Sequence, residues 1–167
     1  MYKRQGKGIG CDAAKKVLDA DKNVSGMILN LGGSSVMSYG SKPDGSAWQV
    51  AVTDPRDTEG DYLGVVTLNG TEFLSTSGDY EKYFIEDGVR YHHILDPATG
   101  YPARSGLTSV TVVCDDGLNA VSYTHLQYVT EPLLLRLSRQ SSFLLWENLP
   151  CGCLLYTSSA EEICIKS

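Results

Sequence analysis

The spacing of apolar and polar residues divides most of this chain into short segments with the pattern of β-strands. Residues 12–21 are the exception, because alanine, lysine and leucine favour a short helix there, with Val17 and Leu18 toward the core. The other apolar runs are bounded by glycine, proline or polar turn residues, as strands are. These runs are residues 26–31, 34–39, 47–53, 62–68, 71–75, 80–85, 89–95 and 107–114, with a loop at 40–46.

Turn residues indicate how these strands connect. Asn69-Gly70 and Asp87-Gly88 accept the positive φ angles of a type I′ turn, so we expect the strands on either side of each pair to form a hairpin. Gly32-Gly33 closes the run 26–31, and residues 34–39 are its expected hairpin partner. One early helix followed by strands predicts an α+β fold, with a mixed, mostly antiparallel sheet and few helices.

The pattern changes after residue 120, and residues 127–167 follow neither a helical nor a strand period. Three strings resemble translations of one transposon-type sequencing adapter: MYKRQ at the start, VSYTHL at 121–126 and CLLYTS at 153–158. Adapter residues are excluded from fold reasoning. We therefore interpret residues 1–5 as adapter-derived, residues 6–120 as part of one native domain and residues 121–167 as a non-native tail.

Charge and composition exclude some partners. The net charge of −6 gives no attraction to nucleic acid. No run of about 18 apolar residues predicts a membrane span, and the short polar start is not a signal peptide.

The cysteines give no sign of a metal site. Cys11 and Cys114 lie in the first part of the chain, and Cys151, Cys153 and Cys164 lie near its end. The Cys151–Cys153 spacing is too tight for the usual zinc pair, so we expect neither a metal site nor a disulfide framework.

Two glycine-rich strings are candidates for ligand binding. Lys7-Gly8-Ile9-Gly10-Cys11-Asp12 is expected as a loop before the helix, where free amides and a lysine favour an anion. The alternative is an ordinary loop capped by Asp12. Asn30–Ser34 brings a strand into a glycine pair, which either seats a ligand against bare backbone or makes a plain tight turn.

Two further strings carry hydroxyls and imidazoles. Ser75–Tyr80 is expected as a loop after a strand, whose hydroxyls, glycine and carboxylate suit phosphate oxygens, or else a turn capped by Asp79. His92 and His93 are expected on a strand, where they point to opposite faces and cannot share one pocket or one metal. One of them is suited to act as a general base.

In this order and spacing, KGIGCD, NLGGS, STSGDYEKYF, HHILDPATGYP and LTSVTVVC resemble the hallmark strings of the ApbE family of FAD:protein FMN transferases, over residues 6–118. The resemblance implies a T-fold-related domain, here incomplete at residues 6–120, with FAD as substrate and Mg²⁺ as cofactor. It implies transfer of FMN to a threonine of a target protein, with release of AMP. Typical targets are membrane redox subunits of the NADH:quinone reductase or Rnf type. The expected location is bacterial, periplasmic or membrane-anchored through a lipoprotein signal absent here, with a cytoplasmic location left open.

The resemblance also assigns site residues. His93 is the expected general base, or the group that orients the threonine, and the carbonyl of Gly6 is the expected metal ligand. For Asp96, a turn anchor before proline is the alternative to a ligand contact. The residues expected to contact FAD are Lys7, Gly8, Ile9, Gly32, Gly33, Thr76, Ser77, Gly78, Asp79, His93, Ile94, Asp96, Thr99 and Gly100.

One departure bears on activity. The family carries a magnesium-binding aspartate near position 121, where this chain has Val121, and an apolar side chain cannot replace an oxygen ligand. The family's N-terminal portion is also absent. We therefore predict that this polypeptide does not transfer flavin. The alternative functions are an FAD pyrophosphatase giving FMN and AMP, and an inert FAD-binding fragment.

Overall fold

The computed structural model describes residues 2–55, 60–129 and 151–157. Their main sheet has five antiparallel strands in the order β1-β2-β5-β8-β9, and two short antiparallel pairs lie beside it. The helices are α1 (Tyr2–Ala20) and α2 (Gly117–Val129). The main-sheet strands are β1 (Gly26–Asn30), β2 (Ser35–Gly40), β5 (Phe73–Gly78), β8 (Leu107–Cys114) and β9 (Gly152–Thr157). The pairs are β3 (Trp48–Thr53) with β4 (Tyr62–Leu68), and β6 (Tyr83–Glu86) with β7 (Val89–His92).

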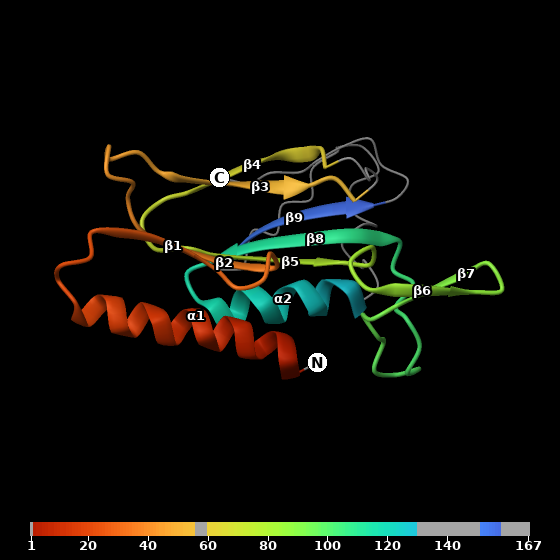
Figure 1. Cartoon of the computed structure of the whole chain (residues 1–167). Helices are drawn as coiled ribbons and strands as arrows, with labels where there is room; N and C mark the ends of the chain where they lie inside the picture. Colours follow the sequence, from red (N-terminus) through yellow and green to blue (C-terminus); the bar gives the residue numbers. More distant parts are fainter. Residues whose placement is uncertain (1, 56–59, 130–150, 158–167) are drawn as a thin grey trace.

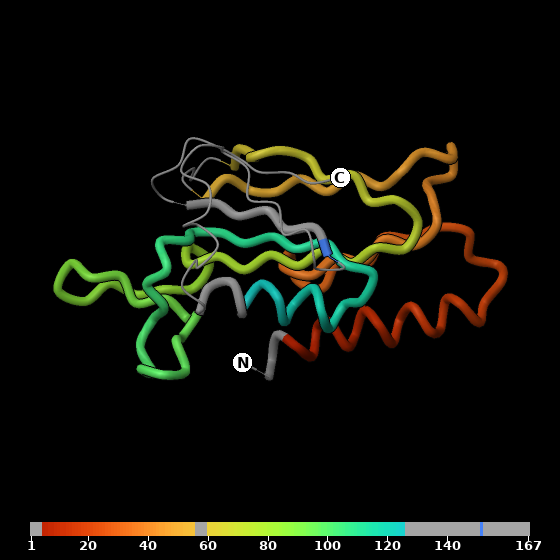
Figure 2. Tube along the Cα trace, turned by 180° about the vertical axis from the view of Figure 1, so that it is seen from behind, coloured from red at the N-terminus to blue at the C-terminus, as the bar shows by residue number. Residues whose placement is uncertain are grey.

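The molecule is layered. α1 and α2 lie side by side under one face of the main sheet, and the β3–β4 pair lies over the other face (Figure 1). The view from behind shows the same three layers, with the β6–β7 hairpin projecting beyond the end of the sheet (Figure 2). The mostly antiparallel α+β fold expected from the sequence is confirmed.

Both faces of the central strands β2 and β5 are buried, since alternate residues of each strand point to opposite faces and each face packs against a different layer. Met37 and Phe73 belong to the core that faces the helices, together with Cys11 and Leu18 of α1. Their sequence neighbours Val36 and Leu74 pack instead with Leu68 and other residues of the β3–β4 pair. The central strands are therefore clamped between two apolar layers.

The expected hairpin at Asn69-Gly70 is wrong. β4 pairs with β3, whereas β5 lies between β2 and β8 in the other sheet. Gly70 does adopt a positive φ of 66°, but the turn carries the chain from one layer to the next. Burial of both faces of β5 outweighs local pairing with β4. The hairpins at Gly32-Gly33 and Asp87-Gly88 are confirmed.

The helix was expected to begin at Asp12, but α1 begins at Tyr2. The string Lys7–Asp12 is therefore helical, and its amides do not belong to a free loop. Gly8 explains the difference, because a Cβ there would collide with the backbone of Gly117 in α2. The glycine is needed where two helix backbones touch. The expectation for Val17 is also wrong, since 69% of it is exposed.

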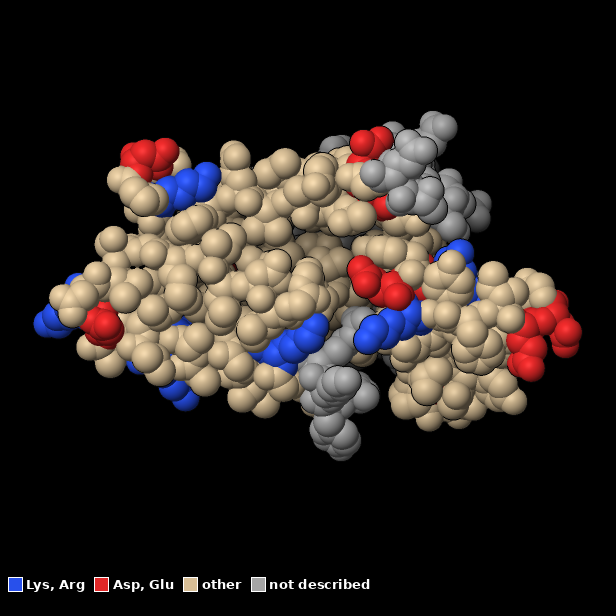
Figure 3. Space-filling model, in the orientation of Figure 1, with Lys and Arg blue, Asp and Glu red and all other residues tan. Residues whose placement is uncertain are grey.

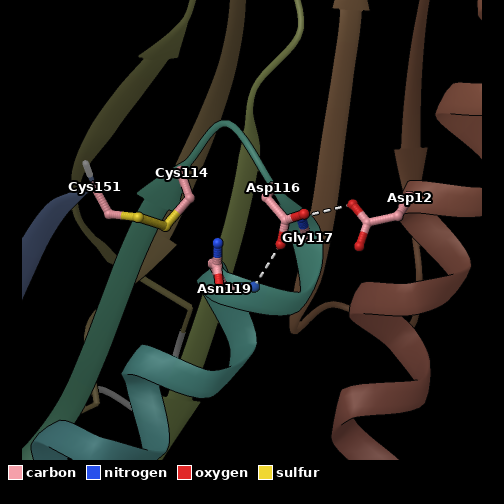
Figure 4. The surroundings of a disulfide bond; sticks show 6 residues. All are labelled: Asp12, Cys114, Asp116, Gly117, Asn119 and Cys151. Atoms are coloured by element: carbon pink, nitrogen blue, oxygen red, sulfur yellow. Dashed lines mark hydrogen bonds between the residues drawn. A yellow bond between two sulfur atoms is a disulfide. The ribbon is translucent and has the colours of Figure 1, made fainter. Parts of the chain in front are cut away.

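The absence of a disulfide was also a wrong expectation. Cys114 and Cys151 are joined, because β8 pairs with β9 and brings the two residues to the same end of the sheet (Figure 4). The adapter-like string at 121–126 lies in α2, and most of the string at 153–158 lies in β9. Residues 130–150 and 158–167 lie outside the described residues. The origin of residues 121–167 stays a prediction.

Within the described ranges, neither helix is long and apolar enough to cross a membrane.

Candidate functional site

Lys7 joins α1 to the turn between β1 and β2. Its ammonium Nζ donates a hydrogen bond to Ser34 Oγ at 2.8 Å. The same nitrogen lies 3.2 Å from the point that a Cβ on Gly32 would occupy. A side chain at Gly32 would therefore crowd the cation. Lys7, Gly32 and Ser34 form one group, which we call the lysine cluster.

The glycine pair beside this cluster is held by its own sequence. Gly33 N donates to the Asn30 side-chain oxygen at 2.7 Å, and both glycines adopt positive φ angles of 68° and 76°. The side-chain hydrogen bond and the positive φ angles are sufficient to form a plain tight turn. The exposed backbone at Gly32 and Gly33 still lies open to a ligand, so their predicted contact with FAD stays a prediction.

The other predicted residues of α1 differ in exposure. Gly8 is buried against α2, Ile9 is 54% exposed, and Gly6 is exposed with open space where a Cβ would lie. Gly8 therefore has a packing role that explains it without a ligand. The predicted roles of Gly6 and Ile9 stay predictions.

Asp12 caps a helix, but not its own. Its two carboxylate oxygens accept hydrogen bonds from Gly117 N at 2.7 Å and Leu118 N at 3.1 Å, at the start of α2 (Figure 4). Asp116 adds a bond from Asn119 N at 2.7 Å. The sequence places Asp12 and Gly117 so far apart that no local signal connects them.

The hydroxyl string lies within a strand. Thr76, Ser77 and Gly78 belong to β5, so the loop expected there is wrong. Thr76 Oγ1 lies 2.8 Å from Thr111 Oγ1 of β8, and Ser77 Oγ donates to the buried Thr124 Oγ1 of α2 at 2.9 Å. Gly78 lies against the Tyr80 ring. These hydroxyls bond to neighbouring elements, so the packing of β5 accounts for them without a phosphate, and the alternative turn capped by Asp79 is wrong as well.

The lysine cluster is continuous with β5. Ser34 O accepts a hydrogen bond from Thr76 N at 3.0 Å and one from Ser75 Oγ at 3.3 Å. Lys7 therefore reaches the middle of β5 through Ser34. From Thr76 the chain runs on through Gly78, the last residue of β5, to Asp79, about 10 Å farther at the usual rise per residue of a strand.

Asp79 stands at the end of β5, beside the β6–β7 hairpin. Its backbone N donates to Thr108 O at 3.0 Å, and its Oδ1 lies 3.6 Å from Arg90 Nη1. Burial raises the pKa of the Asp79 carboxyl, while Arg90 and, to a smaller extent, His92 lower it. Arg90 was not singled out by the sequence, because nothing in its neighbours marks a partner of Asp79.

The two histidines contact different carbonyls. β7 ends at His92, whose Nε2 lies 3.1 Å from Ala103 O. His93 N donates to Lys82 O at 3.1 Å, and its Nδ1 lies 3.1 Å from the same oxygen. Since Lys82 follows Asp79 by three residues, the structure brings His93 to the region at the end of β5.

The string after the histidines forms a tight turn. Asp96 Oδ1 accepts Ala98 N at 2.8 Å, and Asp96 O accepts Gly100 N at 2.8 Å and Thr99 N at 3.3 Å. Gly100 has a φ of 74°, and Ile94 is almost fully buried. These hydrogen bonds are the ones that a turn anchor at Asp96 requires. Contacts of these residues with FAD stay predictions.

The residues that the structure describes do not fit a magnesium site. Val121 is 2% exposed and supplies no oxygen from its side chain, and Thr124 Oγ1 donates to Val121 O at 2.7 Å. Among the described residues, no three His, Cys, Asp or Glu side chains gather where a metal ion would fit. The carbonyl of Gly6 alone does not hold the ion.

Sequence comparison then decides the family. The sequence profile of the ApbE family matches residues 5–137. The chain belongs to the ApbE family. It is 36% identical over 115 residues to the FAD:protein FMN transferase of Escherichia coli K12, and 41% identical over 110 residues to that of Rhodobacter capsulatus. The relatives' name describes a transferase, so this is a family of enzymes.

Solved ApbE structures share the fold. The ApbE protein of Thermotoga maritima superposes with a TM-score of 0.78 at 32% identity, over 96% of this chain and 49% of that one. The apo flavinyl transferase ApbE of Pseudomonas stutzeri gives 0.71 at 28% identity, over 99% and 48%. The E. coli and Rhodobacter matches cover 69% and 63% of this chain but 32% and 20% of those proteins. The chain thus spans a third or less of these relatives.

Proposed function

We propose that this chain carries part of the FAD site of an enzyme that moves FMN from FAD to a threonine of a target protein. The observation that supports it most is the continuous path from Lys7 through Ser34 and β5 to Asp79 and the His93 segment. Predicted FAD contacts from four separate strings of the sequence lie along this path.

In the proposed reaction, the threonine hydroxyl oxygen attacks the phosphorus of the FMN half of FAD. A new phosphorus–oxygen bond forms, the bond to the AMP half breaks, and AMP leaves with the bridging oxygen. The threonine proton passes to His93. If Nδ1–H donates to Lys82 O, the lone pair lies on Nε2, which is then the nitrogen that accepts the proton.

Lys7 supplies the positive charge of this proposal. Its ammonium is held by Ser34 at the open glycine turn, where phosphate oxygens would approach bare backbone. Positioning of the two reactants accounts for most of such a phosphoryl transfer. The same proposal includes two finer assignments. The targets are membrane redox subunits of the NADH:quinone reductase or Rnf type. The location is bacterial, on the periplasmic side or anchored to the membrane.

The resemblance to the family implies magnesium as a cofactor, but this chain has Val121 where the family has the carboxylate that binds the ion. We therefore propose that the chain binds FAD without transferring FMN. The test mixes the chain with FAD, MgCl₂ and a flavin-acceptor domain, then measures FAD binding, flavin fluorescence on denatured protein, and free FMN and AMP.

Each outcome has a meaning. FAD binding without any product agrees with the proposal. Flavin on the acceptor would keep the function and overturn the argument from Val121. Free FMN without labelled acceptor would favour the pyrophosphatase, and failure to bind FAD at high micromolar concentration would overturn the proposed site.

A further inference from the structure

The β6–β7 hairpin carries apolar side chains that the fold leaves uncovered. All four residues of β6 are exposed, among them Tyr83, Phe84 at 60% and Ile85 at 64%. Val89, which begins β7, is exposed as well. Single apolar side chains on a surface are ordinary, but a group of them on one projecting element is typical of an interaction surface.

No other strand of the described residues pairs with this hairpin. β6 and β7 form a sheet of their own, and the pair extends past the end of the main sheet (Figures 1 and 2). A hairpin of two strands is marginally stable in water, and an unpaired strand edge is a template for another chain. The hairpin therefore has both the position and the free edges of a docking element.

The exposed rings are already ordered. Phe84 and Tyr91 stack with their centroids 5.1 Å apart and 9° between their planes. The guanidinium carbon of Arg90 lies 4.5 Å from the centroid of the Tyr83 ring. Tyr83 and Phe84 are neighbours in a strand, so these two pairs lie on opposite faces. Ordered aromatic and arginine side chains lose little entropy on binding and often dominate the energy of an interface.

The charge of the hairpin narrows the class of partner. Its turn carries Glu86 and Asp87, and acidic atoms gather at the end farthest from the sheet (Figure 3). Such a tip is repelled by anionic lipid and attracts the lysine and arginine side chains of a protein. A second copy of this chain is disfavoured by its net charge of −6. These charges favour a different protein with basic residues at the tip.

The other end of the hairpin lies at the proposed reaction site. β7 ends at His92, so His93 is the next residue, and its N donates to the carbonyl of Lys82, which precedes β6. Arg90 Nη1 lies 3.6 Å from Asp79 Oδ1 and joins the hairpin to the end of β5. The length of β6 is about 13 Å at the usual rise per residue. A chain that lay along the hairpin would therefore run between its acidic tip and His93.

We propose that the β6–β7 hairpin is the docking surface for the flavin-acceptor protein. An extended segment of the acceptor lies along the hairpin, places a lysine or arginine against Glu86 and Asp87, and presents its threonine beyond the base, at His93. The length of the hairpin sets the spacing of the basic residue and the threonine at about four to six residues. The identity of the partner rests on the proposed function, in which His93 receives the threonine proton.

The test measures binding of an acceptor to the full chain in the absence of FAD. The probe is the flavin-acceptor domain of an Rnf-type subunit, with its threonine changed to alanine so that no transfer follows. We expect Phe84→Ser and Ile85→Ser each to weaken binding by about tenfold. The matched controls are Tyr62→Ser and Val65→Ser, which remove exposed apolar side chains from β4 and leave the affinity unchanged. Melting temperatures compare the folding of all four variants.

A second variant tests the charge of the tip. Glu86→Gln combined with Asp87→Asn removes both charges at nearly constant size, and asparagine tolerates the φ of 49° at position 87. We expect binding to weaken by about threefold at low salt and to lose most of its dependence on salt. Affinity and salt dependence equal to those of the parent chain would contradict the basic contact at the tip.

Other occupants of the hairpin have their own readouts. Binding to phosphatidylglycerol vesicles that Phe84→Ser abolishes would overturn the proposal in favour of a membrane. A dimer in sedimentation velocity that the same variant abolishes would overturn it in favour of a second copy. FAD binding without acceptor binding would remove the docking surface alone. Acceptor binding that depends on the hairpin, without FAD binding, would keep the docking surface and remove the proposed FAD site.

Discussion

Gly8 and Asp12 illustrate how single residues act in this chain. Both belong to a string whose glycines, lysine and aspartate suggested a phosphate-binding loop. In the structure, Gly8 lets α1 touch α2, and Asp12 caps α2. Of that string, Lys7 alone reaches the proposed FAD site through a side-chain bond that the structure describes, to Ser34. Packing and ligand binding therefore share one short segment.

Substitution of Gly8 by alanine is expected to destabilise the fold, because the new Cβ would meet the Gly117 backbone. The expected loss is about 1–3 kcal/mol, as for other overpacked contacts. Gly6→Ala is the matched control in the same helix, since open space surrounds its Cβ position and alanine favours helix by up to about 1 kcal/mol. Chemical denaturation measures both. Equal stability of the two variants would contradict the close helix contact.

Cys11 gives a prediction on pH. Burial, and in smaller part the charge of Asp12, raise the pKa of its thiol to about 11. A raised folded-state pKa favours folding below the unfolded pKa near 9, and this contribution is lost as pH rises toward 11. We expect the parent chain to lose more stability between pH 8 and pH 10.5 than Cys11→Ala does. Denaturation curves at both pH values measure the difference, and identical pH slopes would contradict it.

The elements show which parts of the fold local sequence determines. Asp87-Gly88 and Gly32-Gly33 predicted their hairpins correctly, because a two-strand turn depends on the positive φ of nearby residues. The hairpin predicted from Asn69-Gly70 is not formed, because a turn of the same kind can also carry the chain from one layer to the next. The start of α1 was missed because Gly8 packs against Gly117 of α2, which lies far along the chain. Long-range packing leaves no local signal.

The cap that Asp12 gives to α2 is testable at this scale. Asp12→Ala removes two hydrogen bonds at the start of α2, and an N-cap of this kind contributes about 1–2 kcal/mol. Asp19→Ala is the control, since Asp19 forms an exposed pair with Lys15 on the same helix, and such pairs contribute less. Thermal unfolding followed by circular dichroism compares them. A smaller effect for Asp12 than for Asp19 would show that the long-range cap is not formed.

At the scale of the whole molecule, the fold brings together what the sequence could only place in order. The strings at Lys7, Ser34 and Thr76 meet through hydrogen bonds, and the His93 segment lies beside the end of β5. The sequence identified most of these residues through their resemblance to the family. It could not reveal Arg90 or the Thr124 contact with Ser77, because these pairs form only when β7 and α2 pack against β5.

Substitution of Val121 tests whether this position lacks a metal ligand. An aspartate placed at this buried position of α2 would destabilise the fold by about 3–5 kcal/mol when its charge has no partner. We expect MgCl₂ to restore part of the melting temperature of Val121→Asp, and to leave Val121→Asn unchanged. If magnesium shifts neither variant, or both equally, position 121 does not face a metal site in this fold.

The central claim is that Lys7 and the glycine turn bind the phosphates of FAD. Titration of FAD into the full chain, followed by flavin fluorescence, tests it with Lys7→Ala and with Lys15→Ala, an exposed lysine of the same helix that pairs with Asp19. The account predicts saturable binding that Lys7→Ala weakens by about tenfold or more, and that Lys15→Ala leaves unchanged. Absence of binding at high micromolar FAD, or equal affinities for the two variants, would contradict it.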